Sequence, residues 1–170
     1  KNISNSLVFS HRRLSILDLS INGKQPMISK SGRFTITFNG EIYNHKDIRE
    51  EIEKKNKLYN WRGHSDTEIL LEAIEEFSLE NTLRKINGMF AFALWDNKNK
   101  ELFLVRDRFG EKPLYWGFAN SENYPKKEAF VFSSEISGIF SLKGFHKSIN
   151  YDSLSYYFQN GYIDQPYTIQ

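Results

Sequence analysis

The sequence predicts an α+β fold in which helices cover antiparallel sheets. Segments with strand-like alternation fill much of the second half of the chain, and segments with helical spacing of hydrophobic residues lie in the first half. The turns between the later strands are too short for a parallel crossover, so those strands are expected to pair antiparallel. With 170 residues, the chain is long enough for one well-packed domain and short for two.

The first strand predicted with clear alternation lies at residues 33–38. Before it, residues 7–19 are expected to be extended, followed by a polar loop. Residues 33–38 alternate Phe or Ile with Thr, which indicates a strand with one hydrophobic face. This strand is expected to end at Asn39 and Gly40, where a loop would begin.

Three helices are expected next. Asn44 is a suitable N-cap for a helix whose hydrophobic residues lie one turn apart. Ser65 and Glu68 have the S-x-x-E spacing of a capping box, directly before a long amphipathic run. A short helix over residues 81–86, closed by Gly88, should follow.

The remainder is predicted to alternate strands and short helices. Residues 89–95 carry hydrophobic side chains on both faces, so this strand should be covered on both sides. Either Asn150 or Asp152 could cap the last helix. The expected strands are 89–95, 101–105, 114–118 and 129–133, and the expected helices are 136–142 and 151–158.

Composition excludes several classes of function. Lys and Arg total 23 against 21 Asp and Glu, a net charge of +2, which argues against nucleic acid or an anionic membrane as main partner. No hydrophobic run is long enough to span a bilayer. The chain has no cysteine, which excludes disulfides and thiolate metal sites within it. Its four scattered histidines do not favour a metal site, and none is predicted; they are His11, His45, His64 and His146.

The segment Asn39 to Asn44 permits two interpretations. Asn-Gly is the strongest signal for a type I′ hairpin turn, which would require a second alternating strand after Gly40. A helix N-cap follows instead, so the segment could equally form a site at the end of a strand. There, the Asn39 side chain and the Gly40 N–H could stabilise an oxyanion together.

Other charged residues also have two interpretations. Arg12 and Arg13 could form an exposed pair at a sheet edge or a fork that binds a ligand carboxylate. Asp66 could complement the dipole of its helix or hold a ligand ammonium group. The charged segment 106–115 could be a solvated turn, a salt-bridged corner or a domain interface.

Taken in order, these segments resemble the glutaminase domain of glutamine-hydrolysing asparagine synthetase. The resemblance extends from about Leu7 to Leu142 and implies a class II glutamine amidotransferase domain. Its fold would be an N-terminal-nucleophile-type αββα sandwich with two antiparallel sheets, here incomplete at the N-terminus. The matching strings are HRRLSI at 11–16, NGEIYN at 39–44, SDTE at 65–68, GMFAFA at 88–93, the segment 106–115 and SSE at 133–135.

The resemblance also implies residue roles. Arg13 would bind the α-carboxylate, Leu14 and Ile16 would give main-chain contacts, Asn39 and Gly40 would form the oxyanion hole, and Glu41 and Asp66 would hold the α-ammonium.

The family mechanism requires an N-terminal cysteine, and this sequence has none. The chain is therefore expected to be a fragment, with residues 1–147 a partial amidotransferase domain and 148–170 the lead into a synthetase domain. The resemblance implies a cytoplasmic enzyme, MgATP bound only by that synthetase domain, glutamine and the synthetase domain as partners, and a homodimer as a further option.

Rival functions remain open on the sequence alone. Related amidotransferases amidate sugars or antibiotic precursors instead of aspartate. A non-catalytic module that binds an amino acid or a partner protein would also explain the missing cysteine. A nucleic-acid-binding module is the weakest alternative, because the net charge is so small.

Overall fold

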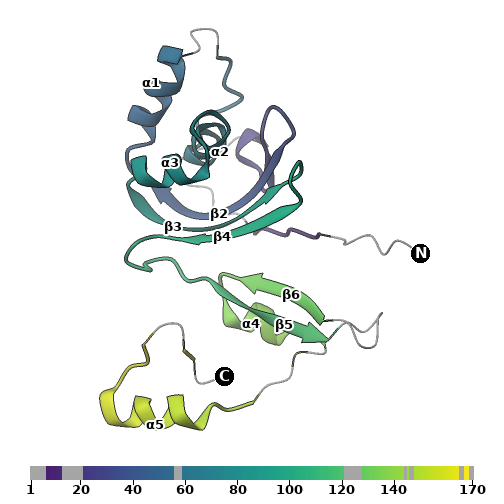
Figure 1. Ribbon diagram of the computed structural model, residues 1–170, viewed down its shortest axis with the longest axis vertical. Coiled ribbons are helices and arrows are strands. Elements are labelled where there is room, and N and C mark those ends of the chain that lie inside the picture. The colour runs from purple at the N-terminus through teal and green to yellow at the C-terminus, as the bar shows by residue number, and fades with distance from the viewer. Residues whose placement is uncertain are drawn as a thin grey trace, which may run out of the picture. The chain divides into compact units, whose positions relative to one another are not determined.

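The computed structural model describes residues 7–12, 21–55, 59–120, 128–143, 145, 148–164 and 167–168. The chain divides into two compact units, Lys1–Leu114 and Tyr115–Gln170. The described part of the first unit forms a sheet with three α-helices, and that of the second forms a hairpin with two (Figure 1).

The sheet of the first unit has four antiparallel strands in the order β1-β2-β3-β4. A 3-10 turn, η1, precedes it, and β2 and β3 pair along their whole length. The bounds are η1 (Ile21–Gly23), β1 (Met27–Ile28), β2 (Phe34–Ile42), β3 (Gly88–Asp96) and β4 (Glu101–Arg106). Residues 7–12 form neither helix nor strand, and 13–19 of the expected extended segment lie outside the described residues.

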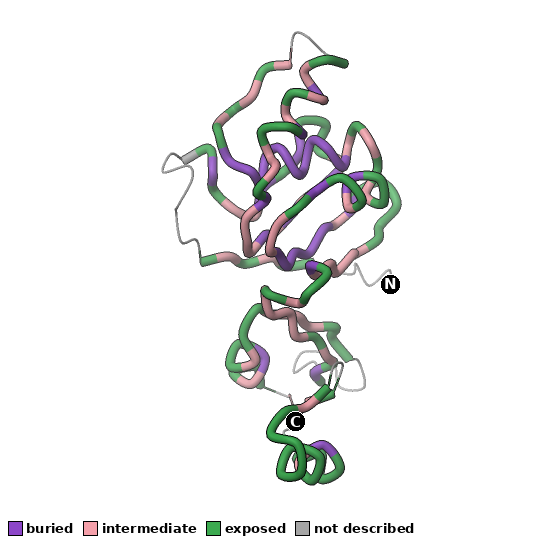
Figure 2. Tube along the Cα trace, turned by 90° about the vertical axis from the view of Figure 1, so that its left-hand side faces the viewer, coloured by how far each residue is buried: buried purple, intermediate pink, exposed green. Residues whose placement is uncertain are grey.

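Three helices cover one face of this sheet (Figure 1). They are α1 (His45–Lys55), α2 (Asp66–Phe77) and α3 (Leu79–Lys85). Alternate residues of β2 are buried against them, as the sequence predicts. Figure 2 shows the resulting buried core between sheet and helices. Its fully enclosed members include Ile36, Leu71, Ala73 and Leu94, each 0% exposed.

The predicted capping box at the start of α2 is half formed. Ser65 Oγ accepts the Glu68 N–H at 3.2 Å, which confirms Ser65 as the N-cap. The Glu68 carboxylate does not return to Ser65. It accepts the N–H groups of Arg62 and Gly63, both at 2.9 Å, and fixes the loop before the helix instead.

Several predicted boundaries are wrong. The strand expected to end at Asn39 and Gly40 continues to Ile42, because both residues pair with β3 in register. The hairpin interpretation is therefore wrong too. Gly88 does not close α3 but begins β3, and α3 runs from Leu79 to Lys85 rather than over 81–86.

The helix expected after Asn44 is confirmed, but its cap differs. Asn44 lies just before α1, and its main-chain oxygen accepts the Ile48 N–H. Its side chain instead joins the turn before β3, donating to the Lys85 carbonyl at 3.0 Å and accepting the Asn87 N–H at 2.8 Å.

The second unit confirms the expected hairpin and both helices. Strands β5 (Tyr115–Asn120) and β6 (Glu128–Ser133) pair antiparallel, and α4 (Ile136–Phe140) packs on them. Helix α5 (Tyr151–Asn160) is capped by Asn150, whose Oδ1 accepts the Ser153 N–H at 3.0 Å. Asp152 is therefore not the cap.

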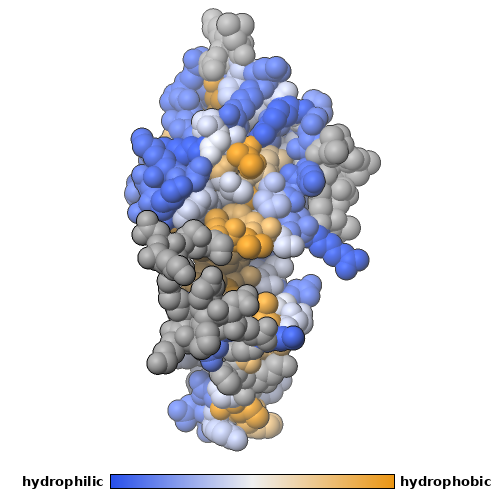
Figure 3. Space-filling view, turned by 90° about the vertical axis from the view of Figure 1, so that its right-hand side faces the viewer, coloured by the Kyte–Doolittle hydropathy of each residue, from blue (hydrophilic) through white to orange (hydrophobic). Residues whose placement is uncertain are grey.

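Burial matches the prediction that β3 is covered on both faces. Phe90 and Phe92 on one face and Ala91 and Ala93 on the other are all at most 3% exposed. Hydrophobic side chains also reach the surface, where Figure 3 shows them as orange areas among blue hydrophilic ones. Among the helices that the structure describes, none combines the length and apolar character needed to cross a membrane.

Candidate active site

The structure brings four of the seven predicted site residues to one end of β2. Asn39, Gly40 and Glu41 follow one another in that strand, and Asp66 is the first residue of α2. The other three predicted residues lie outside the described part of the chain; they are Arg13, Leu14 and Ile16.

Strand alternation decides where the Asn39 and Glu41 side chains point. The buried residues Phe38 and Ile42 face the helices, so Asn39 and Glu41 project from the opposite face of the sheet. Both are partly exposed. An amide and a carboxylate therefore lie side by side on the face of the sheet opposite α1–α3.

The backbone of Gly40 faces the edge of the sheet. Its partner in β3 is Phe90. The Phe90 N–H donates to the Asp107 carboxylate and the Phe90 oxygen accepts the Asp107 N–H, so both main-chain groups of Phe90 point away from β2. Gly40 and Phe90 thus form a non-hydrogen-bonded pair, and the N–H of Gly40 points away from β3. On that edge β1 pairs only with Thr35 and Ile36, so no described strand covers Gly40.

Side chains bind the strand edge on both sides of Gly40. The Gln25 amide binds both main-chain groups of Phe38, accepting its N–H at 2.6 Å and donating to its oxygen at 3.1 Å. Asp66 Oδ2 accepts the N–H of Ile42 at 2.9 Å. The Gly40 N–H faces outward between these two occupied positions. It lies two residues of strand, about 7 Å, from the Ile42 N–H that Asp66 binds.

Asp66 is an acidic group held in a buried position. It is 6% exposed, and burial raises the pKa of its carboxyl above the ordinary value. The N–H groups of Ile42 and Thr67 and the nearby His45 act to lower that pKa, while the charge of Glu41 raises it further. A cation that arrived between Glu41 and Asp66 would relieve the repulsion between the two carboxylates.

Gly40 is required by its surroundings. Its φ is +150°, and a Cβ at this position would lie 2.1 Å from the Met89 oxygen and 2.6 Å from the Phe90 Cα. There is equally little space at Gly88 in β3, where an added Cβ would lie 2.1 Å from the Glu41 oxygen. The two strands thus approach closely at the site, and only residues without a Cβ allow it.

The charged segment 106–115 is an ordered corner held by main-chain hydrogen bonds. The Asp107 carboxylate, 6% exposed, accepts four of them, from the N–H groups of Phe90, Phe109, Glu111 and Lys112 at 2.9–3.1 Å. Of the three interpretations that the sequence leaves open, a solvated turn fits the tip of the segment, where Phe109 is 87% exposed and Arg108 and Glu111 are exposed as well. The ion pairs found among the described residues do not include this corner, so the salt-bridged interpretation is wrong.

Two arginines complete this corner. Arg106 donates to the carbonyl oxygens of Gly110 and Lys112 at 2.5 and 2.6 Å. Arg108 donates to those of Leu83 and Ile86 at 2.9 and 3.3 Å, at the end of α3. The corner therefore connects β4 to the helices and, through Phe90, to the strand position opposite Gly40.

Sequence reasoning did not single out Gln25 or the role of Asp107. Gln25 lies in a polar loop and belongs to no motif considered. Asp107 was visible only as part of a charged run. The signal that could have identified it is a lone acid between two arginines at a strand end, followed by Gly110, which has a φ of +66°.

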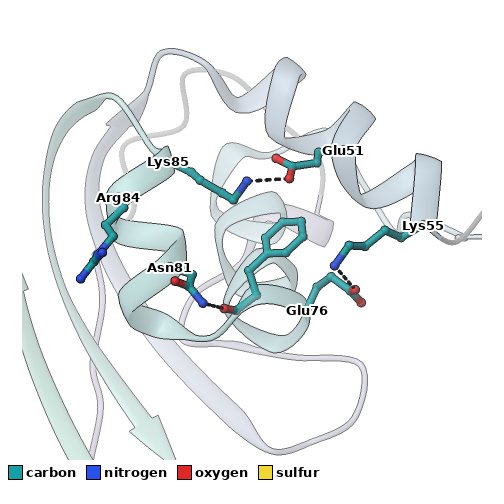
Figure 4. A pocket seen from close by; sticks show the side chains of 7 residues that line it. Glu51, Lys55, Glu76, Asn81, Arg84 and Lys85 are labelled. Atoms are coloured by element: carbon teal, nitrogen blue, oxygen red, sulfur yellow. Dashed lines mark hydrogen bonds and ion pairs between the residues drawn. The ribbon is translucent and has the colours of Figure 1, made fainter.

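The helical layer contains a separate pocket of about 520 Å³ (Figure 4). It lies among α1, α2 and α3, on the side of the sheet away from Asn39 and Glu41. The Phe77 ring lies between the ammonium groups of Lys55 and Lys85, and these pair with Glu76 at 3.0 Å and Glu51 at 2.6 Å. Arg84, the third cation of the lining, pairs with Glu80 at 2.6 Å. Every charge of the lining is thus already paired, which does not favour an amino-acid site there.

No group of three or more potential metal ligands occurs among the residues that the structure describes. The candidate site is instead an arrangement of hydrogen-bond donors and carboxylates. Asn39 and the Gly40 N–H can donate to an oxygen that becomes negative, and Glu41 and Asp66 can hold a cation nearby.

Comparison with known proteins identifies the family of the chain. The family model described as a glutamine amidotransferase domain matches residues 2–170. Glutamine-hydrolyzing asparagine synthetase 3 of Bacillus subtilis is 36% identical over 157 residues, which cover 91% of this chain and 24% of the relative. Glutamine-hydrolyzing asparagine synthetase 1 of the same organism is 36% identical over 164 residues, which cover 95% of this chain and 24% of the relative.

A plant asparagine synthetase is also similar to this chain. Glutamine-hydrolyzing asparagine synthetase 2 of Arabidopsis thaliana is 39% identical over 114 residues, covering 66% of this chain and 19% of the relative. The chain spans about a quarter of the length of the Bacillus relatives. Since the family model covers nearly every residue, the chain belongs to the glutamine amidotransferase domain family.

Proposed function

We propose that this chain is the glutaminase part of a glutamine-hydrolysing asparagine synthetase. It would hydrolyse glutamine to glutamate and ammonia, and the ammonia would serve the ATP-dependent amidation of aspartate. The observation that carries the proposal is the outward-facing Gly40 N–H beside the Asn39 amide, with Asp66 bound two residues further along the same edge. The names of the relatives support asparagine as the product.

In the proposed complex, each polar group of glutamine has a partner. The α-ammonium lies between Glu41 and Asp66, whose mutual repulsion it relieves. The side-chain carbonyl accepts hydrogen bonds from the Asn39 amide and the Gly40 N–H. Arg13 binds the α-carboxylate, with main-chain contacts from Leu14 and Ile16.

The proposed reaction is nucleophilic catalysis by a thiol. The free α-amino group of an N-terminal cysteine accepts the proton of the thiol. The thiolate then attacks the side-chain carbonyl carbon, and the negative charge moves onto its oxygen, which Asn39 and Gly40 stabilise. The C–N bond breaks, ammonia leaves with a proton from the cysteine α-amino group, and a glutamyl thioester remains. Water then hydrolyses the thioester to glutamate and the free thiol. These 170 residues hold no cysteine, so this thiol would come from outside them.

We propose that residues 1–147 form the amidotransferase part and residues 148–170 connect it to a synthetase domain. MgATP would belong to that synthetase domain. None of the residues of this chain is assigned to it, because the sequence has no phosphate-binding glycine loop.

The site is tested by removing its donors and its charge in the protein expressed from the complete reading frame. Asn39→Ala should lower glutamine-dependent asparagine formation by about 100- to 1,000-fold, because one oxyanion donor is lost. Asp66→Asn should raise the KM for glutamine by about 10- to 100-fold, because a charged hydrogen bond to the ammonium is lost. Asparagine formation from added ammonia should stay unchanged in both variants.

The control is Asn99→Ala, which removes an amide from the exposed β3–β4 turn where only the main chain of Asn99 is bound. It should leave both activities intact. Equal loss of the glutamine-dependent and ammonia-dependent activities in Asn39→Ala would contradict the assignment.

The chain by itself gives a second test of the mechanism. The 170 residues, purified alone, should release no ammonia from glutamine because they contain no thiol. A coupled glutamate dehydrogenase assay measures the ammonia. Activity that co-purifies with the chain and is lost in Asn39→Ala would show that the nucleophile is not a cysteine.

A further inference from the structure

We propose that Gln25 is a positioning residue for the oxyanion site, holding the strand so that the Gly40 N–H points at the substrate. This inference rests on the proposed function. Gln25 does not touch the reacting atoms; it acts through the main chain of Phe38, two residues before Gly40.

The Gln25 amide replaces a neighbouring strand. In an antiparallel sheet, a hydrogen-bonded residue pair exchanges one N–H and one C=O in each direction. Gln25 offers Phe38 the same two groups from one side chain, at 2.6 and 3.1 Å. The side chain is half-buried, and β1 pairs with β2 only at Thr35 and Ile36. Gln25 therefore extends the support of β2 past the last residue that β1 reaches.

Gly40 requires this support. A glycine has the widest conformational freedom of any residue, and Gly40 has a φ of +150°. The residues on either side of Gly40 pair with β3 along one edge of β2 only, so along the other edge the strand depends on side chains for support. Gln25 fixes Phe38 and Asp66 fixes Ile42, so the outward N–H of Gly40 is held between two bound positions. A donor held in place before the reaction stabilises an oxyanion without reorganisation.

Ser29 provides a matched comparison on the same strand. Its Oγ accepts the N–H of Phe34 at 3.1 Å, and Ser29 is 4% exposed. Loss of this bond removes a side-chain contact to the backbone of β2, as loss of Gln25 does, but six residues from Gly40. The two positions therefore separate an effect on the oxyanion site from a general effect on the strand.

The experiment compares Gln25→Met, Gln25→Ala and Ser29→Ala in the protein expressed from the complete reading frame. Steady-state kinetics of glutamine hydrolysis, ammonia-dependent asparagine formation and thermal unfolding are measured for each. Both Gln25 variants should lower kcat about 10- to 100-fold, less than loss of a donor itself, with KM for glutamine within about threefold of wild type. Ammonia-dependent formation should be unchanged, and Ser29→Ala should keep the wild-type kcat.

Other outcomes overturn the proposal. Equal loss of kcat in Ser29→Ala, a rise in KM alone, or wild-type kcat in the Gln25 variants would each show that Gln25 does not position the donor. Unfolding of both Gln25 variants while Ser29→Ala stays folded would make the role of Gln25 purely structural. If Asn39→Ala also keeps the wild-type kcat for glutamine hydrolysis, the proposed function itself fails. If the Gln25 variants keep this kcat while Asn39→Ala loses it, only the inference about Gln25 fails.

Discussion

Replacing Gly40 with alanine is expected to lower the melting temperature of the protein by about 10 °C or more. The added Cβ would lie 2.1 Å from the Met89 oxygen and 2.6 Å from the Phe90 Cα, and both are main-chain atoms of β3. Main-chain atoms cannot rotate away as a flexible side chain does, so β2 and β3 must separate. The cost should be about 4 kcal/mol or more, among the largest for a single substitution.

Gly32→Ala is the matched control for this effect. Gly32 also has a positive φ, +76°, but nothing lies within 4 Å of its Cβ position. Its substitution therefore adds backbone strain of about 1 kcal/mol without a collision. Differential scanning calorimetry of both variants separates the two contributions. Melting of Gly40→Ala within about 2 °C of Gly32→Ala would refute the close approach of the strands.

Replacing Asp107 with asparagine is expected to destabilise the protein by about 3–5 kcal/mol. The carboxylate uses both oxygens, each accepting two main-chain N–H groups. An asparagine has one oxygen, and its NH₂ group would face two N–H donors that then have no acceptor. Each such buried donor costs about 1–3 kcal/mol, and the bonds that remain lose their charge assistance. Urea unfolding measures the difference.

The contribution of the Asp107 carboxylate to the free energy of unfolding should depend on pH. Burial raises the pKa of this carboxyl, but the four N–H groups together outweigh it, so its pKa lies below the ordinary value. Its stabilisation is then complete above the unfolded-state pKa of about 4 and is lost as the pH falls through the lower folded-state value. The gap between wild type and Asp107→Asn should narrow only in that acidic range. Asp47→Asn, an exposed acid in the first turn of α1, is the control and should cost less than about 1 kcal/mol.

The elements of the fold were predictable where local pattern and long-range packing agree. The alternation of residues 33–38 and the Ser65 cap both appear where expected. The extent of β2 was not predictable, because Asn-Gly is a strong local signal for a turn. Pairing of Asn39 with Ala91 and Gly40 with Phe90 overrides that signal, and the partners lie some fifty residues away in sequence.

The candidate site was predicted by residue type but not by geometry. Residue types suggested an amide, a glycine and two carboxylates, and the structure places these four at one end of β2. Nothing local indicates that Gln25 binds Phe38 or that Asp107 accepts four N–H groups. Such bonds depend on the path of the chain, and one acid looks like another in a charged run until that path is known.

The paired glycines Gly40 and Gly88 also restrict how the chain can misfold. Each lies where a Cβ would come 2.1 Å from an oxygen of the facing strand. A slip of two residues between β2 and β3 keeps the hydrophobic face inward, so hydrophobic patterning alone does not prevent it. Such a slip would bring Phe38 or Ile42 to the closest point of approach and force the strands apart. The glycines thus favour one alignment of β2 with β3, and with it one position of Asn39 and Gly40, the proposed oxyanion donors, opposite Ala91 and Phe90.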